Sequence, residues 1–164
     1  GGAGQFWPDV WKKFKDPIPT DEQSDLIKAY NKRLFSGNIR EEMAFGQHWS
    51  AWENALASIV SDGISARAPA DYARTFARLE NHYFINNGFL DDKDAILSNM
   101  DKIENIPGNI VQGRFDMICP PTSAFKLFEK WPNAKIKIVP QAGHAMSEPG
   151  ISSELVQITN ELVS

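Results

Sequence analysis

The spacing of apolar residues changes near the middle of the chain. Up to about residue 99, apolar side chains recur every three or four positions, which is the period of a helix with one buried face. Beyond residue 108, short apolar runs alternate with helical stretches. The order of strand, helix, strand and helix is typical of α/β folds with parallel strands. We therefore expect a mostly helical part at residues 1–100 and an α/β part at residues 101–164.

The helical part is predicted to contain several consecutive helices. Thr20 and Gln23 have the spacing of a capping box, which predicts a helix that begins at Thr20 and stops before Gly37. Further helices are expected over residues 40–60, from Pro69 onward, and over residues 93–100. The expected apolar stripes are Leu26, Ile27, Tyr30 and Leu34, then Trp49, Trp52, Leu56 and Ile59, then Tyr72, Phe76, Leu79 and Tyr83.

The α/β part is predicted to contain two strands and two helices. Residues 109–115 form one short apolar run, and residues 135–139 alternate with a period of two. A helix is expected over residues 122–130, and a last helix carries Ile151, Leu155, Ile158 and Leu162. Because two strands form a poor sheet by themselves, the pattern indicates the end of a larger parallel sheet.

Composition and charge exclude several classes of protein. The formal net charge is −4 and the basic residues are scattered, so no nucleic-acid partner is expected. No apolar run approaches the roughly 20 residues that span a bilayer, and the N-terminus lacks signal-peptide features, so no membrane partner is expected. Cys119 is the single cysteine, which favours a reducing compartment and a cytoplasmic protein. His48 and His82 lack metal-ligand spacing, so neither a metal nor a cofactor is expected.

Two residues follow the predicted strands at the edge where parallel sheets carry their sites. Asp116 comes directly after the first strand, and His144 follows the second strand after a short turn. An acid followed by a histidine is the order of the last two members of a catalytic triad in many hydrolases. The acid would fix the tautomer of the histidine, which would then act as a general base. Taken singly, each residue is also compatible with an ordinary loop.

A nucleophile to accompany this pair is absent from the 164 residues. The motif Gly-x-Ser-x-Gly does not occur, and Ser65 and Ser147 lack the strand–turn–helix context that such a serine requires. Cys119 follows the acid in sequence, so it is not interpreted as the nucleophile. We expect the serine to lie upstream of Gly1.

Two glutamates interrupt the predicted aromatic faces of the helices. Glu53 lies between Trp49 and Leu56, and Glu80 lies between Phe76 and Phe84. A carboxylate among aromatic rings is unfavourable unless a cation or hydrogen-bond donors meet it, so the pair could hold a substrate ammonium group. The alternative is that each glutamate reaches water or pairs with an arginine such as Arg74 or Arg78.

Six segments, in order along the chain, resemble proline iminopeptidases, which are serine peptidases of the α/β-hydrolase fold. They are residues 6–11 (F-W-P-D-V-W), 49–53 (W-S-A-W-E), 77–84 (A-R-L-E-N-H-Y-F), 113–117 (G-R-F-D-M), 131–134 (W-P-N-A) and 142–144 (A-G-H). The resemblance implies a helical cap domain at residues 1–100 and the C-terminal part of the hydrolase core at residues 101–164.

The resemblance also implies a function and a set of site residues. The substrate would be a peptide with an N-terminal proline, which the enzyme releases. Asp116 and His144 would be the acid and base of the triad, and Glu53 and Glu80 would bind the imino nitrogen. The proline pocket would be lined by Phe84 and Cys119.

The missing nucleophile limits what this chain is expected to do alone. Without serine and oxyanion hole, the chain is expected not to hydrolyse peptides, and its exposed strand edges predict self-association. Two other interpretations stay open: another α/β-hydrolase, such as an epoxide hydrolase or esterase, and a non-enzymatic oligomeric binding module derived from the fold. The paired glutamates favour the aminopeptidase, because the other hydrolases have no substrate ammonium group to bind.

Overall fold

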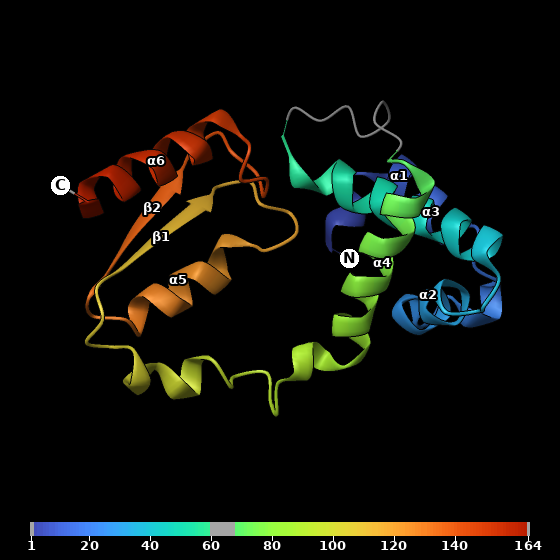
Figure 1. Cartoon of the computed structure of the whole chain (residues 1–164), viewed down its shortest axis with the longest axis horizontal. Helices are drawn as coiled ribbons and strands as arrows, with labels where there is room; N and C mark the ends of the chain where they lie inside the picture. Colours follow the sequence, from blue (N-terminus) through green and yellow to red (C-terminus); the bar gives the residue numbers. More distant parts are fainter. Residues whose placement is uncertain (1, 60–67, 164) are drawn as a thin grey trace. The chain divides into compact units, whose positions relative to one another are not determined.

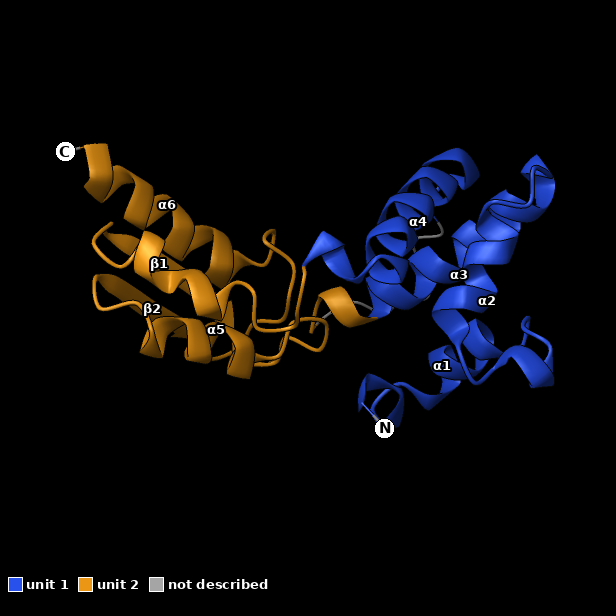
Figure 2. Ribbon diagram, turned by 90° about the horizontal axis from the view of Figure 1, so that it is seen from below, with its two compact units in different colours: residues 1–55, 61–90 blue, residues 56–60, 91–164 orange. Residues whose placement is uncertain are grey.

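The chain forms two compact units, shown in different colours in Figure 2. The computed structural model describes residues 2–59 and 68–163. Of these, residues 2–55 and 68–90 form the first unit, and residues 56–59 and 91–163 form the second. The units thus divide after residue 90, and the assignment of residues 1–100 to a cap domain stays a prediction.

Within its described residues, the first unit contains helices and no strand. Its α-helices are α1 (Pro8–Lys15), α2 (Leu26–Leu34), α3 (Ile39–Ala57), whose last two residues belong to the second unit, and α4 (Ala70–Ile85) (Figure 1). Short 3-10 helices occur at Gly2–Gln5, Thr20–Glu22 and Asn87–Phe89. The expected helix over residues 40–60 is confirmed as α3 through Ala57, and its last residue, Val60, lies outside the described residues.

The predicted capping box at Thr20 is wrong. Thr20 begins a 3-10 helix without a side-chain cap, and α2 starts only at Leu26. Asp25 caps α2 instead, because its Oδ1 accepts a hydrogen bond of 3.0 Å from the backbone N–H of Lys28. The Gln23 amide, expected to bond back to Thr20, donates to the carbonyl of Ile18 at 2.7 Å.

Aromatic side chains form the core of the first unit. Phe14 of α1 stacks on Tyr30 of α2 with ring centroids 4.4 Å apart, and the Tyr30 hydroxyl donates to the Phe14 carbonyl at 2.6 Å. Trp49 of α3 packs edge-on against both rings and is 2% exposed. Burial of three large rings with their polar atoms satisfied ties α1, α2 and α3 together.

The buried face of α4 differs from the predicted one. Ala73, Ala77 and Asn81 are buried, whereas Tyr72, Leu79 and Tyr83 of the predicted stripe are at least half exposed. The reason is close helix packing. A Cβ atom at Gly46 of α3 would lie 2.7 Å from the Cα of Arg74, so α4 turns its small residues toward α3.

The second unit has the predicted order of strand, helix, strand and helix. Strands β1 (Gly108–Gly113) and β2 (Ala134–Val139) are parallel and pair Gly108 with Ala134 through Gly113 with Val139. Helices α5 (Pro121–Glu129) and α6 (Pro149–Val163) lie on opposite sides of this pair (Figure 1). Instead of an α-helix over residues 93–100, the chain has a 3-10 helix at Leu97–Lys102. The core of this unit packs Val111 and Val139 against Ile151 and Leu155 of α6.

The end of β1 lies against the loop that precedes His144. A Cβ atom at Gly113 would lie 1.9 Å from the carbonyl oxygen of Gly143, so this strand end requires glycine. The backbone N–H of Phe115 then donates to the carbonyl of Ala142 at 2.9 Å. These contacts bring the chain segments of Asp116 and His144 together. No helix within the described residues is long and apolar enough to cross a membrane.

Candidate active site

Asp116 and His144 meet at the carboxyl edge of the two strands. Because β1 and β2 run parallel, the loops that follow them leave the sheet on the same side. The Nδ1 atom of His144 lies 3.0 Å from Oδ2 of Asp116. The Asp116 side chain is only 6% exposed, whereas that of His144 is 40% exposed. A buried acid thus orients an imidazole that remains accessible to a reacting group.

The carboxylate of Asp116 is fixed by donors from its own loop. Its Oδ1 accepts hydrogen bonds from the backbone N–H groups of Ile118 at 3.0 Å and Cys119 at 2.7 Å. Its Oδ2 also accepts from the side-chain amide of Gln112 at 3.2 Å. An ionised acceptor facing Nδ1 favours the tautomer with the proton on Nδ1, which leaves the lone pair on Nε2 for proton transfer.

The two glutamates singled out in the sequence interact in the first unit. Glu80 of α4 accepts a hydrogen bond of 2.7 Å at Oε2 from the indole Nε1–H of Trp49 on α3. Burial, together with the negative charge of Glu80, raises the pKa of Glu53 to about 7. Glu53 therefore takes up a proton near neutral pH unless a cation meets it.

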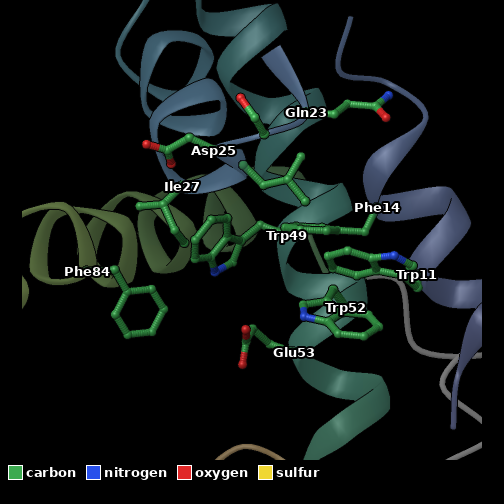
Figure 3. A pocket seen from close by; sticks show the side chains of 11 residues that line it. Trp11, Phe14, Gln23, Asp25, Ile27, Trp49, Trp52, Glu53 and Phe84 are labelled. Atoms are coloured by element: carbon green, nitrogen blue, oxygen red, sulfur yellow. The ribbon is translucent and has the colours of Figure 1, made fainter. Parts of the chain in front are cut away.

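Glu53 lies at a pocket that has five aromatic residues among the eleven that line it. The pocket has a volume of about 610 Å³. Figure 3 shows the Glu53 carboxylate between the rings of Trp52 and Phe84, with Trp49 beside them. The remaining lining residues are Trp11, Phe14, Gln23, Ser24, Asp25, Leu26 and Ile27. An acidic group within an apolar wall suits a small ligand that combines a cation with hydrocarbon.

The structure groups the predicted site residues by unit. Asp116, His144 and Cys119 lie together in the second unit, where the backbone of Cys119 donates to Asp116. The first unit holds Glu53 and Glu80, and Phe84 lines the pocket that Glu53 borders.

Sequence reasoning missed Gln112 as a partner of the acid and Trp49 as a donor to Glu80. Neither residue belongs to a motif. Gln112 lies on β1, which directly precedes the loop of Asp116, and Trp49 lies on α3, which also carries Glu53. Among the described residues, no group of three or more histidine, cysteine or acidic side chains is arranged to hold a metal ion.

Comparisons with known proteins support the resemblance seen in the sequence. No family model matches the chain. Proline iminopeptidase of Arabidopsis thaliana is 44% identical over 98% of this chain and 43% of its own length. A probable proline iminopeptidase of Leptolyngbya boryana is 41% identical over 99% of the chain and 51% of its own length. Proline iminopeptidase of Neisseria gonorrhoeae is 38% identical over 99% of this chain and 52% of its own length.

The chain spans about half the length of the curated relatives it matches. Among solved structures, an esterase from Exiguobacterium antarcticum matches 85% of this chain and 48% of its own length, with 16% identity and a TM-score of 0.48. The sequence identities to the curated relatives confirm the resemblance to proline iminopeptidases for this stretch. The predicted order of elements is confirmed, because a helical part is followed by two parallel strands and their helices.

Proposed function

We propose that this chain is the part of a proline iminopeptidase that supplies the acid and base of the triad and recognises the substrate N-terminus. The observation that carries the proposal is the His144–Asp116 contact of 3.0 Å at the carboxyl edge of parallel strands. The names of the relatives, at 37% to 44% identity, support the proposed reaction class. The serine nucleophile belongs, in this proposal, to residues outside these 164.

His144 transfers the proton in both halves of the proposed reaction. Its Nε2 accepts the serine proton as the serine oxygen attacks the carbonyl carbon of the N-terminal proline. The same proton then passes to the leaving nitrogen as the peptide bond breaks, and water releases proline from the acyl-enzyme by the reverse roles. Asp116 stabilises the imidazolium formed in each half because its buried carboxylate faces Nδ1.

Glu53 and Glu80 select, in this proposal, for a charged N-terminus. A protonated proline nitrogen has two N–H donors, and two carboxylates provide matching acceptors. The cation stabilises the ionised form of Glu53, whose pKa burial otherwise raises to about 7. An internal peptide bond has no such cation, so it leaves a desolvated carboxylate uncompensated. This difference restricts cleavage to the N-terminal residue.

The remaining assignments concern the pocket and the whole protein. Phe84 lines the aromatic pocket beside Glu53 in the first unit, and we assign it a contact with the proline ring. We assign Cys119 of the second unit a contact with the same ring. We assign residues 1–100 to the cap domain and residues 101–164 to the hydrolase core. The single cysteine supports a cytoplasmic location.

The test uses the protein translated from the complete reading frame that contains these residues. Two substrates are compared, the 7-amido-4-methylcoumarin derivative of L-proline and its N-acetyl form, which has no charge on nitrogen. We expect release of the fluorophore from the free proline derivative and at least a 100-fold lower kcat/KM for the acetylated one. Glu53→Gln should reduce the ratio of kcat/KM between the free and the acetylated substrate. Glu129→Gln, at an exposed position of α5, should leave this ratio unchanged. Equal hydrolysis of both substrates would contradict the proposal and favour an esterase-like hydrolase.

A further inference from the structure

A second buried carboxylate lies beside the loop of His144. Glu148, the residue before α6, is 8% exposed and has no part in the mechanism above. Burial of a carboxylate is unfavourable unless donors satisfy it, so its presence calls for a role. Its contacts show which parts of the chain depend on it.

Glu148 binds two segments that are far apart in sequence. Its Oε2 accepts a hydrogen bond of 2.8 Å from the backbone N–H of Gly143, which immediately precedes His144. Its Oε1 accepts one of 2.9 Å from the backbone N–H of Ile59. The side chain of Ser58 also bonds to this carboxylate. One side chain thus joins the His144 loop to residues 58–59 within the second unit.

The same two segments are joined directly at the next residues. The carbonyl oxygen of Ala57 accepts hydrogen bonds from the backbone N–H groups of His144 at 2.9 Å and Ala145 at 2.7 Å. Little space remains between them, since a Cβ atom at Gly143 would lie 3.2 Å from both Ala57 O and Glu148 Oε1. The backbone of His144 is therefore held on one side by β1 and on the other by residues 57–59.

The charge of Glu148 suits this position. Burial opposes its ionisation, but hydrogen bonds from Ser58, Gly143 and Ile59 outweigh burial, so its pKa lies below the ordinary value. The negative charge of Asp116 raises the pKa of Glu148, against the effect of these hydrogen bonds. Glu148 is thus ionised at neutral pH, and each carboxylate oxygen accepts a backbone N–H.

We propose that Glu148 is a positioning residue for His144: by binding Gly143 and Ile59 at once, it fixes the backbone that holds the imidazole on Asp116. The proposal rests on the role of His144 given above. A glutamine at position 148 keeps the size of the side chain but turns one acceptor into an N–H₂ group that faces a backbone donor. One of the two hydrogen bonds from the backbone to residue 148 is then lost, and the His144–Asp116 contact loosens.

The first experiment uses this chain alone and needs no hydrolysis. NMR of histidine-labelled protein follows the Nδ1–H proton of His144. In Glu148→Gln we expect the low-field Nδ1–H signal to broaden or vanish, because the contact with Asp116 that protects this proton from exchange with water loosens. The matched control is Glu154→Gln, which removes a charge from α6 that pairs with Lys137. Signals of His144 that match the wild type in Glu148→Gln would overturn the proposal.

A second variant covers the case in which Glu148→Gln does not fold. Glu148→Asp keeps the charge but shortens the side chain by one methylene, so one carboxylate can no longer reach both Gly143 and Ile59. We expect a smaller change in the same His144 signals, and unchanged signals would overturn the proposal.

Kinetics of the complete protein separate this proposal from the proposed function. Glu148→Gln should lower kcat by roughly 10- to 100-fold with little change in KM, as expected for a misplaced base. A complete protein without peptidase activity, together with altered His144 signals, would refute the function and keep the positioning role. Normal kcat in Glu148→Gln would refute the positioning role and keep the function.

Discussion

At the residue scale, the site residues could be proposed from the sequence, but their partners could not. Asp116 and His144 follow predicted strands, and Glu53 interrupts a predicted aromatic face, so residue type and period sufficed. The donor to Glu80 is Trp49, which a sequence pattern assigns to the core rather than to a hydrogen bond. Glu148 bonds to Ile59, and no local pattern relates residues so far apart.

The raised pKa of Glu53 predicts a stability that depends on pH. Folding raises its pKa from 4.5 to about 7, so the folded chain binds the proton more tightly than the unfolded chain. The wild type therefore loses stability as pH rises from about 4.5 to about 7 and loses no more from this group above that range. The loss is on the order of 3 kcal/mol, which Glu53→Gln should abolish. Urea denaturation at pH 5 and pH 8 measures it.

The matched control for this prediction is Glu129→Gln, an exposed glutamate on α5. The free energy of unfolding of the Glu129→Gln variant should depend on pH in the same way as that of the wild type. If Glu53→Gln lost as much stability as the wild type between pH 5 and pH 8, the carboxyl group of Glu53 would not be the source of the effect.

At the element scale, periodicity predicted the strands and most helices, while packing decided which faces are buried. The alternation at residues 135–139 is confirmed as β2, and α3 lies where its apolar spacing placed it. The prediction of the buried face of α4 was wrong. The small residues Ala73 and Ala77 let α3 approach α4 closely at Gly46, and this contact decides which face is buried. The predicted start of α2 at Thr20 was wrong because Asp25, and not Thr20, is the N-cap of this helix.

The close contact between β1 and the His144 loop predicts the effect of a single methyl group. Gly113→Ala would place a Cβ atom 1.9 Å from the Gly143 carbonyl oxygen, so strand and loop must separate. We expect a loss of about 1–3 kcal/mol in the free energy of unfolding. The His144–Asp116 contact should weaken at the same time. Chemical denaturation measures the first effect, and the Nδ1–H signal of His144 reports the second.

Asn109→Ala is the control on the same strand, because Asn109 is exposed and lies away from the loop. It should change stability by at most about 0.5 kcal/mol and leave the His144 signal in place. A Gly113→Ala chain as stable as this control would show that the strand end tolerates a side chain, against the packing described above.

At the scale of the whole molecule, the order of elements was predictable because strand and helix periods differ. The division into a helical and an α/β part was also visible in the sequence, whereas the boundary after residue 90 was not. That boundary depends on which elements pack together, and residues 91–107 carry no strong apolar period. The described residues contain a sheet of two strands only, so each strand has one edge without a strand partner.

The unpaired edges predict self-association of this chain when it is expressed alone. Backbone N–H and C=O groups on an open strand edge pair readily with a second copy. The exposed side chains of Tyr72, Leu79 and Tyr83 add apolar surface. Size-exclusion chromatography with light scattering should give a mass of at least twice 18.4 kDa. A single monodisperse species of 18.4 kDa at micromolar concentration would contradict this expectation.

The central claim is that these 164 residues supply the acid and base of a peptidase whose nucleophile lies elsewhere in the protein. The most direct test measures release of proline from L-proline 7-amido-4-methylcoumarin by three proteins: the product of the complete reading frame, the same protein with Asp116→Asn, and this chain alone. The account predicts rapid release by the first, a loss of about 10⁴-fold in kcat for the second, and no release by the third. Hydrolysis by the chain alone, or undiminished hydrolysis by the Asp116→Asn protein, would contradict it.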